Sequence, residues 1–189
     1  MCNDYLKQTT DERLNDRGVD DALRANIQYY RSETRFLRAL MYYHAMDMFG
    51  NTPFITENDP IGTYLPPQRS RAELYSFIES ELLELSDDPH MTEPRQNEYG
   101  RADKAAVWML LSRLYLNAEV YIQTPKYDEC MKYARNVISA GYDLCPNYAE
   151  LFMADNGENT DARKEMIFTI NFDGRWTLSL IHISEPTRH

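Results

Sequence analysis

Histidines and cysteines are the residues of this chain that could bind a metal ion or act as nucleophiles. The three cysteines are widely spaced and form no CxxC pair, so they predict neither a disulfide framework nor a zinc site. Their expected role is that of small apolar core residues. They are Cys2, Cys130 and Cys145, and the four histidines are His44, His90, His182 and His189. His44 and Asp47 share a helix face, but a histidine in that setting is usually a packed residue. No metal ligand is therefore predicted.

Carboxylates are numerous, with 30 Asp and Glu in 189 residues. A glycosidase needs two of them across a cleft, whereas those between Glu79 and Asp88 follow the solvated face and end of one helix. The run DNGENTD at 155–161 lacks the twelve-position spacing and closing Glu of a calcium loop. The seven glycines form no phosphate-binding motif. No catalytic residue and no cofactor are predicted, and a glycosidase is the most remote of the function classes considered.

Loop aromatics are the better candidates for ligand contact. The stretch at 51–68 contains four prolines and Gly62, so it is predicted to be a long surface loop. A loop tyrosine flanked by Asn and Asp can stack on a sugar ring and hydrogen-bond its hydroxyls. The candidate ligand-binding residues are Tyr64, Asn58, Asp59 and Tyr99. The alternative is that these residues cover their own helices, as expected for Phe54.

Composition excludes some partners. The net charge is -10 and the pI is near 4.9, without a Lys/Arg cluster, so nucleic acid is not an expected ligand. The longest apolar run, 105–111, is too short to span a bilayer, and residues 1–30 contain no signal-peptide pattern. One domain, or one piece of a larger domain, fits this length.

The fold class predicted from periodicity is mostly α. One long helix is expected from Asp20 to Phe49, ended by Gly50. A capping box at 70–73 starts a second helix. A third, at 102–121, is apolar on most sides and should form the centre of the fold. Pro125 is expected to open a fourth helix that ends at Gly141. One short strand is predicted at 165–172.

Two of these helices carry a repeat signal. A W-x2-L-S-x2-Y pattern is followed, after an insertion, by an A-x3-I…P pattern, which together match a tetratricopeptide repeat. The matching residues are Trp108, Leu111, Ser112, Tyr115, Ala134, Ile138 and Pro146. Small residues in this pattern allow paired antiparallel helices to approach closely, and Ala134, Ile138, Cys130 and Val137 are expected on the buried face of the fourth helix. The pattern predicts tetratricopeptide-like antiparallel helix pairs.

Five ordered segments resemble the SusD/RagB family of nutrient-binding lipoproteins. They are SETRFLRALMYYHAMDMFGNTPFIT (32–56), SRAELYSFIESELLEL (70–85), GRADKAAVWMLLSRLYLNAEVY (100–121), YDECMKYARNVISAGYDL (127–144) and EMIFTINFDG (165–174). The resemblance implies an outward-facing outer-membrane lipoprotein. Such proteins bind glycans or other nutrients without catalysis and partner a SusC-like TonB-dependent transporter.

Both ends of the chain depart from this family. Family members begin with a signal peptide and a lipidated Cys, and they continue into a loop-rich second half. Residues 1–177 are therefore expected to be part of a SusD-like helical domain, with Cys2 inside a helix and membrane attachment only through the lipid anchor of a full-length parent. The segment LSLIHISEPTRH (178–189) resembles translated sequencing-adapter DNA, and we interpret it as an artefact outside the domain.

The repeat signal alone would also fit a helical-repeat scaffold that binds other proteins. A glycan-binding component of an uptake system is the function that the resemblance favours, and the scaffold is its alternative. Ligand identity is not encoded in any pattern found here.

Overall fold

The computed structural model describes residues 1–60 and 64–171 of the chain. Within them the structure is mostly helical, with one two-stranded sheet. The helices are α1 (Cys2–Gln8), α2 (Asp11–Asp16), α3 (Asp21–Phe49), α4 (Arg71–Asp87), α5 (Lys104–Leu116), α6 (Ala118–Ile122), α7 (Tyr127–Ser139) and α8 (Thr160–Glu165), with a 3₁₀ turn η1 (Tyr148–Phe152). Strands β1 (Thr52–Pro53) and β2 (Gln68–Arg69) pair antiparallel at the base of the long loop.

The longest helix, α3, begins and ends where the sequence predicts. The Asp20 carboxylate accepts a hydrogen bond from the Leu23 amide at 2.8 Å and caps the first turn. Gly50 has a φ of +73° and ends the helix, a conformation that residues with a side chain rarely adopt. The predicted capping box of α4 is also confirmed, since Ser70 and Glu73 exchange hydrogen bonds.

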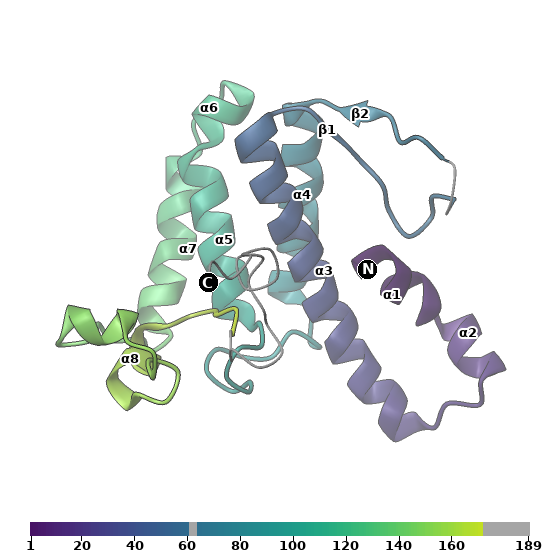
Figure 1. The fold of residues 1–189 in the computed structure, drawn as a ribbon. Coiled ribbons are helices and arrows are strands. Elements are labelled where there is room, and N and C mark those ends of the chain that lie inside the picture. Colours follow the sequence, from purple (N-terminus) through teal and green to yellow (C-terminus); the bar gives the residue numbers. More distant parts are fainter. Residues whose placement is uncertain (61–63, 172–189) are drawn as a thin grey trace, which may run out of the picture.

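Successive long helices run antiparallel. Figure 1 shows α3 rising beside α4, which descends, and α5 rising beside α7, which descends. Ser112 of α5 lies 3.3 Å from the Cys130 carbonyl of α7, because a small side chain allows close approach at this point. Tyr115 and Tyr133 stack across the same pair with ring centroids 5.8 Å apart. The predicted antiparallel helix pairs are therefore confirmed.

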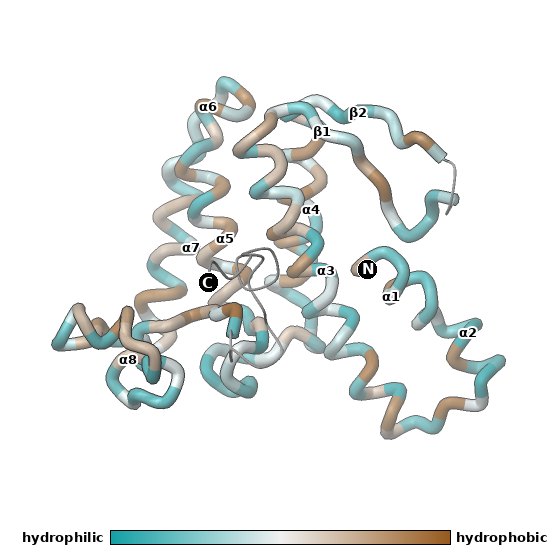
Figure 2. The backbone as a smooth tube through the Cα atoms, in the orientation of Figure 1, coloured by the Kyte–Doolittle hydropathy of each residue, from teal (hydrophilic) through white to brown (hydrophobic). Residues whose placement is uncertain are grey.

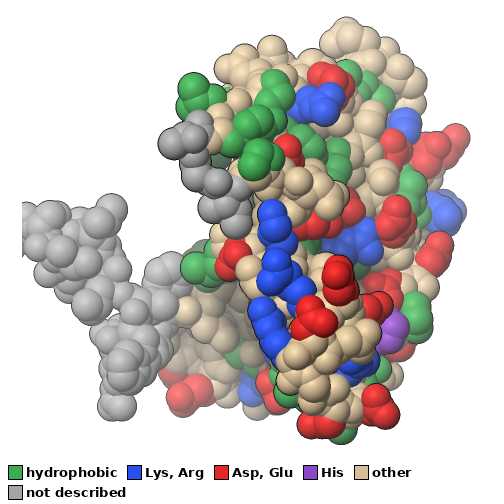
Figure 3. Space-filling model, turned by 90° about the vertical axis from the view of Figure 1, so that its right-hand side faces the viewer, with side chains coloured by type: hydrophobic (Ala, Val, Ile, Leu, Met, Phe, Trp, Pro, Cys, Tyr) green, Lys and Arg blue, Asp and Glu red, His purple; other side chains and the backbone are tan. Residues whose placement is uncertain are grey.

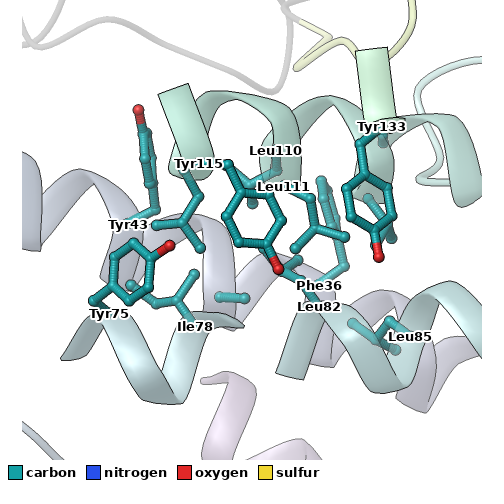
Figure 4. Close-up of a cluster of buried hydrophobic side chains, with 14 of the residues drawn as sticks. Phe36, Tyr43, Tyr75, Ile78, Leu82, Leu85, Leu110, Leu111, Tyr115 and Tyr133 are labelled. Atoms are coloured by element: carbon teal, nitrogen blue, oxygen red, sulfur yellow. The ribbon is translucent and has the colours of Figure 1, made fainter. Parts of the chain in front are cut away.

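The core lies between α3, α4, α5 and α7. Figure 2 shows hydrophobic residues interspersed with hydrophilic ones along α3, as amphipathic packing requires. Figure 4 shows the side chains that meet in the centre, contributed by all four helices: Phe36, Tyr43, Tyr75, Ile78, Leu82, Leu85, Leu110, Leu111, Tyr115 and Tyr133. Trp108 is only partly buried and donates to Ser86 Oγ at 2.9 Å, so it lies at the edge of the core and not in its centre.

The predicted strand at 165–172 is wrong for its described residues. Glu165 ends α8, and residues 166–171 have no strand partner. Hydrophobic residues occupy both alternating sets of this segment, and Ile167 and Phe168, neighbours in sequence, both pack against the core. Phe168 contacts Phe36 edge-on with centroids 5.4 Å apart. The alternation therefore reflects packing without sheet formation. Phe172 and residues 173–189, including the predicted artefact at 178–189, lie outside the described residues.

Four smaller expectations are also corrected. The helix predicted at 102–121 is interrupted at Asn117, whose amide side chain donates to the Arg113 carbonyl at 3.0 Å and competes with the helical pattern. The fourth helix begins at Tyr127, two residues after Pro125. Ile138, expected on the buried face of α7, is 77% exposed, whereas Val137 is buried there as predicted, together with Tyr133. Of the three cysteines, only Cys145 is buried.

Candidate functional site

The first part of the long loop, residues 54–59, is fixed to the helices below it. Phe54 packs against Phe77 of α4 with ring centroids 4.7 Å apart, as the sequence predicts. The Tyr42 hydroxyl of α3 donates to the Ile55 carbonyl at 2.7 Å and accepts from the Ile55 amide at 3.0 Å. We call residues 54–59 the anchored segment. The Tyr42 side chain of α3 therefore pairs with both backbone polar groups of Ile55.

Asp59 stabilises the turn within this segment. Its Oδ2 accepts hydrogen bonds from the Thr56 amide at 2.7 Å and the Thr56 hydroxyl at 3.0 Å. These bonds, with nearby Arg69 and the Tyr64 hydroxyl, lower the pKa of Asp59 below its usual range. The carboxylate is ionised at neutral pH, and one of its oxygens is already committed to the turn.

Asn58 and Tyr64, two of the candidate ligand-binding residues, are accessible at the surface. The Asn58 side chain is exposed, and Tyr64 is 39% exposed. Tyr64 follows Asn58 and Asp59 in the same loop. An aromatic face beside an amide and a carboxylate can stack on a sugar ring and hydrogen-bond its hydroxyls. Asn58, Asp59 and Tyr64 lie in this one loop and remain the candidates for ligand contact there.

Tyr99 lies elsewhere, in the loop before α5. The Arg163 guanidinium lies 4.6 Å from the centroid of its ring. Gly157 lies against the ring as well, since a Cβ added there would come within 3.4 Å of Tyr99 Cε1. The Tyr99 hydroxyl donates to Met166 Sδ at 3.3 Å. These contacts leave little of the Tyr99 ring for stacking on a sugar, and they give it the role of joining the loop to α8.

A polar pocket of about 340 Å³ adjoins Tyr99. Its lining includes four cationic and two acidic side chains, from Arg95, Arg101, Arg163, Lys164, Glu98 and Asp103. Arg101 is paired with Glu33 at 2.5 Å and Lys164 with Asp161 at 2.7 Å, so two of the cations are already neutralised. Neither this pocket nor the adjacent one of about 700 Å³ includes Asn58, Asp59 or Tyr64. The four predicted residues thus form two separate groups.

Asp103 in this pocket has a structural role. Burial raises its pKa, while hydrogen bonds from the backbone amides of Arg95, Ala106 and Ala105 oppose the rise. The two alanine amides belong to the first turn of α5, so Asp103 is the N-cap of that helix. The Arg95 amide donates to it from a residue with a φ of +62°.

No group of three or more His, Cys, Asp or Glu side chains in residues 1–60 and 64–171 is arranged to hold a metal ion. His90 Nδ1 lies 3.2 Å from Asp88 Oδ1, and Asp88 Oδ2 accepts a hydrogen bond from Ser32 at 2.6 Å, so these contacts join the end of α4 to α3. Figure 3 shows one face of the molecule, on which Lys and Arg side chains are intermixed with Asp and Glu. That face is therefore of mixed charge and not uniformly positive.

The residues that bind the anchored segment from below were not predicted from the sequence. Asn3 Nδ2 of α1 donates to the Ile55 carbonyl at 2.9 Å, and Lys7 Nζ lies 3.4 Å from the Asp59 carbonyl. Arg38 of α3 donates to Glu57 at 2.5 Å. The two α1 contacts each span 52 residues of sequence, and no local pattern could indicate them.

Comparison with known proteins assigns the chain to a family. No family model matches it. Over 144 residues it is 49% identical to the starch-binding protein SusD of Bacteroides thetaiotaomicron, a match that covers 76% of this chain and 25% of the relative. The chain belongs to the SusD family. It spans about a quarter of the length of the curated SusD-like relatives that it matches.

Solved SusD-like structures share the fold. Surface glycan-binding protein A from Bacteroides uniformis is 27% identical, with a TM-score of 0.69, and the match covers 90% of this chain and 35% of that one. The protein of the same name from Bacteroides thetaiotaomicron, in complex with laminarihexaose, is also 27% identical, with a TM-score of 0.61, and covers 88% of this chain and 32% of that one. Among the described residues of this SusD-like chain, no helix is long and apolar enough to cross a membrane.

Proposed function

We propose that this chain forms part of a protein that binds neutral glycans without catalysis, as a component of a nutrient-uptake system. The observation that carries the proposal is the 49% identity to a starch-binding SusD protein over 144 residues. Glycan-binding proteins with the same fold support it. The chain spans about a quarter of the starch-binding relative, so we assign this function to the full-length protein, of which residues 1–177 would be one part.

An α-glucan is the first ligand to test. The most informative relative is named for starch binding, and starch is uncharged. An uncharged ligand is recognised by stacking and hydrogen bonds more than by ion pairs. Among the described residues, Asn58, Asp59 and Tyr64 offer these groups, while Tyr99 has its ring occupied by Arg163 and Gly157. We therefore place the contribution of this chain to the site in the loop that carries Tyr64.

Family membership also supports a location and a partner. The protein would face outward at the outer membrane, held there by a lipid anchor of the full-length parent, and it would deliver glycan to a SusC-like TonB-dependent transporter. A reading frame for such a transporter beside the gene, and a signal peptide with a lipid-attachment Cys upstream, would support this placement. Their absence would favour a helical-repeat scaffold.

Affinity electrophoresis tests the proposal. The chain is run through native gels that contain starch, laminarin or xyloglucan, with a non-binding protein of similar size as reference. One exposed aromatic contact contributes about 1 kcal/mol, and even millimolar affinity needs roughly 4 kcal/mol. We expect weak but measurable retardation by starch, because a polymer presents many copies of the ligand. Equal mobility in all gels would contradict the proposal for this chain, and release of sugars from starch would contradict the absence of catalysis.

One observation supports the alternative, a scaffold that binds proteins. Met48 and Phe49, at the end of α3, are 66% and 72% exposed. Large exposed apolar residues commonly mark a protein contact. Loss of co-purification with a partner in a Met48→Ser, Phe49→Ser variant, with starch retardation absent in both forms, would favour the scaffold.

A further inference from the structure

Helix α1 contacts the anchored segment directly. Asn3 Nδ2 donates to the Ile55 carbonyl at 2.9 Å, and the same carbonyl accepts from the Tyr42 hydroxyl at 2.7 Å. Lys7, one turn further along α1, reaches the Asp59 carbonyl at 3.4 Å. The two contacts hold the segment at both of its ends. Figure 1 shows α1 lying below the loop that runs from β1 to β2.

Arg38 connects α1 and the anchored segment to the core. Its Nη1 donates to Asn3 Oδ1 at 3.1 Å and to Glu57 at 2.5 Å, and its Nη2 donates to Glu81 of α4 at 2.8 Å. Its side chain is 6% exposed. A planar guanidinium held on one side by Glu81 presents its other N–H groups in a fixed direction. Arg38 therefore sets the positions of Asn3 and Glu57 relative to each other.

These contacts also affect neighbouring residues of the loop. Asn58 lies between Glu57 and Asp59. Arg38 binds the Glu57 side chain, and Lys7 binds the Asp59 carbonyl. Asp59 in turn accepts hydrogen bonds from the Thr56 amide and hydroxyl, and Tyr64 follows in the same loop. A weak site gains affinity when its groups are held in one geometry before the ligand arrives.

We propose that Asn3, Lys7 and Arg38 are positioning residues for the glycan-contacting loop, so that α1 is an integral part of that site. That these residues support a glycan site rests on the proposed glycan binding. That α1 holds the anchored segment in place is independent of the proposed glycan binding.

Amide hydrogen exchange on the full 189-residue chain tests the structural half. The Ile55 amide, bonded to Tyr42, and the Thr56 amide, bonded to Asp59, report on the anchored segment. In Asn3→Ala and in Lys7→Ala, we expect exchange at these amides to be at least ~fivefold faster, with exchange in the buried parts of α4 and α5 unchanged. Lys7→Arg keeps a long cationic donor and should restore the slow exchange.

Asn15→Ala is the matched control, since Asn15 lies on α2 and its side chain accepts from Arg24, remote from the loop. It should leave exchange at Ile55 and Thr56 as in the unmodified chain. Unchanged exchange in both Asn3→Ala and Lys7→Ala, or a rise of equal size throughout the chain, would overturn the inference.

Starch retardation of the same variants tests the functional half. Weaker retardation by Asn3→Ala and Lys7→Ala, with restoration by Lys7→Arg, supports the positioning role. Faster local exchange with undiminished retardation overturns it. If the unmodified chain shows no retardation while the exchange result holds, the proposed glycan binding fails and the α1 contact stands.

Discussion

Arg38 of α3 and Glu81 of α4 form a buried ion pair, with Nη2 and Oε2 2.8 Å apart. Glu81 also accepts from Arg35, and Arg38 also binds Glu57, so the pair is the centre of a network that joins α3, α4 and the anchored segment. Buried charges are costly to leave without a partner. The position of the loop and the packing of the first helix pair therefore depend on the same residues.

Arg38→Ala should lower the free energy of unfolding by about 3 kcal/mol, because it removes one partner from a buried pair. Chemical denaturation measures the loss. Arg69→Ala is the matched control: Arg69 pairs with Glu73 at 2.9 Å on the surface, where both side chains are about half exposed, and its removal should cost less than about 1 kcal/mol. Equal losses in the two variants would show that the Arg38 network contributes no more than a surface pair.

Leu111→Ala should cost about 2 to 5 kcal/mol, since Leu111 is fully buried at the centre of the core shown in Figure 4. Leu116, on the same helix, is 56% exposed, so Leu116→Ala should be nearly neutral. Thermal and denaturant unfolding of both variants would check this. If Leu111→Ala left the free energy of unfolding unchanged, α5 would not lie at the centre of the core.

The capping box of α4 predicts a specific pH dependence. Hydrogen bonds from the Ser70 amide and hydroxyl, and from Arg69, lower the pKa of Glu73 to about 2 from its ordinary 4.5. Because the folded-state pKa is the lower one, the stabilisation is present above about pH 4.5 and is lost as the pH falls towards 2. Glu73→Gln should therefore show a smaller decrease in stability over this window. Parallel curves for the two proteins would mean that Glu73 does not contribute.

Tyr99 and Tyr64 should respond in opposite ways to substitution. Tyr99→Ala removes contacts with Arg163, Gly157 and Met166, so we expect a lower melting temperature and unchanged starch retardation. Tyr64→Ala should leave the melting temperature nearly unchanged and reduce retardation. If only Tyr99→Ala reduced starch retardation, the glycan would bind in the pocket beside α8 and not at the Tyr64 loop.

Helix ends that depend on contacts between residues close in sequence could be predicted from the sequence. Gly50 and the Ser70 capping box mark helix ends through contacts within a few residues, and both were predicted correctly. The break at Asn117 depends on one side chain competing for a carbonyl, which periodicity does not reveal. The strand expected at 165–172 failed because pairing requires a neighbouring strand, and alternation cannot show whether one is present.

The candidate site was less predictable for a related reason. Loop composition indicated Asn58, Asp59 and Tyr64 together, and in the structure Asn58 and Tyr64 are exposed. Tyr99 shared the same composition signal, but its ring is covered by Arg163 and Gly157, about 60 residues further along the chain. Whether a loop aromatic is available to a ligand depends on such distant contacts. The contribution of α1 lay beyond sequence reasoning for the same reason.

The most direct test of glycan binding at this loop is a nuclear magnetic resonance titration of the isotope-labelled chain with a linear α-1,4-glucan oligosaccharide. We expect shifts in the amide signals of Asn58, Asp59 and Tyr64 that grow with sugar concentration, at an affinity weaker than millimolar, and that are lost in Tyr64→Ala. Shifts confined to the residues around Tyr99, or no shifts up to the highest sugar concentration that dissolves, would contradict glycan binding at this loop.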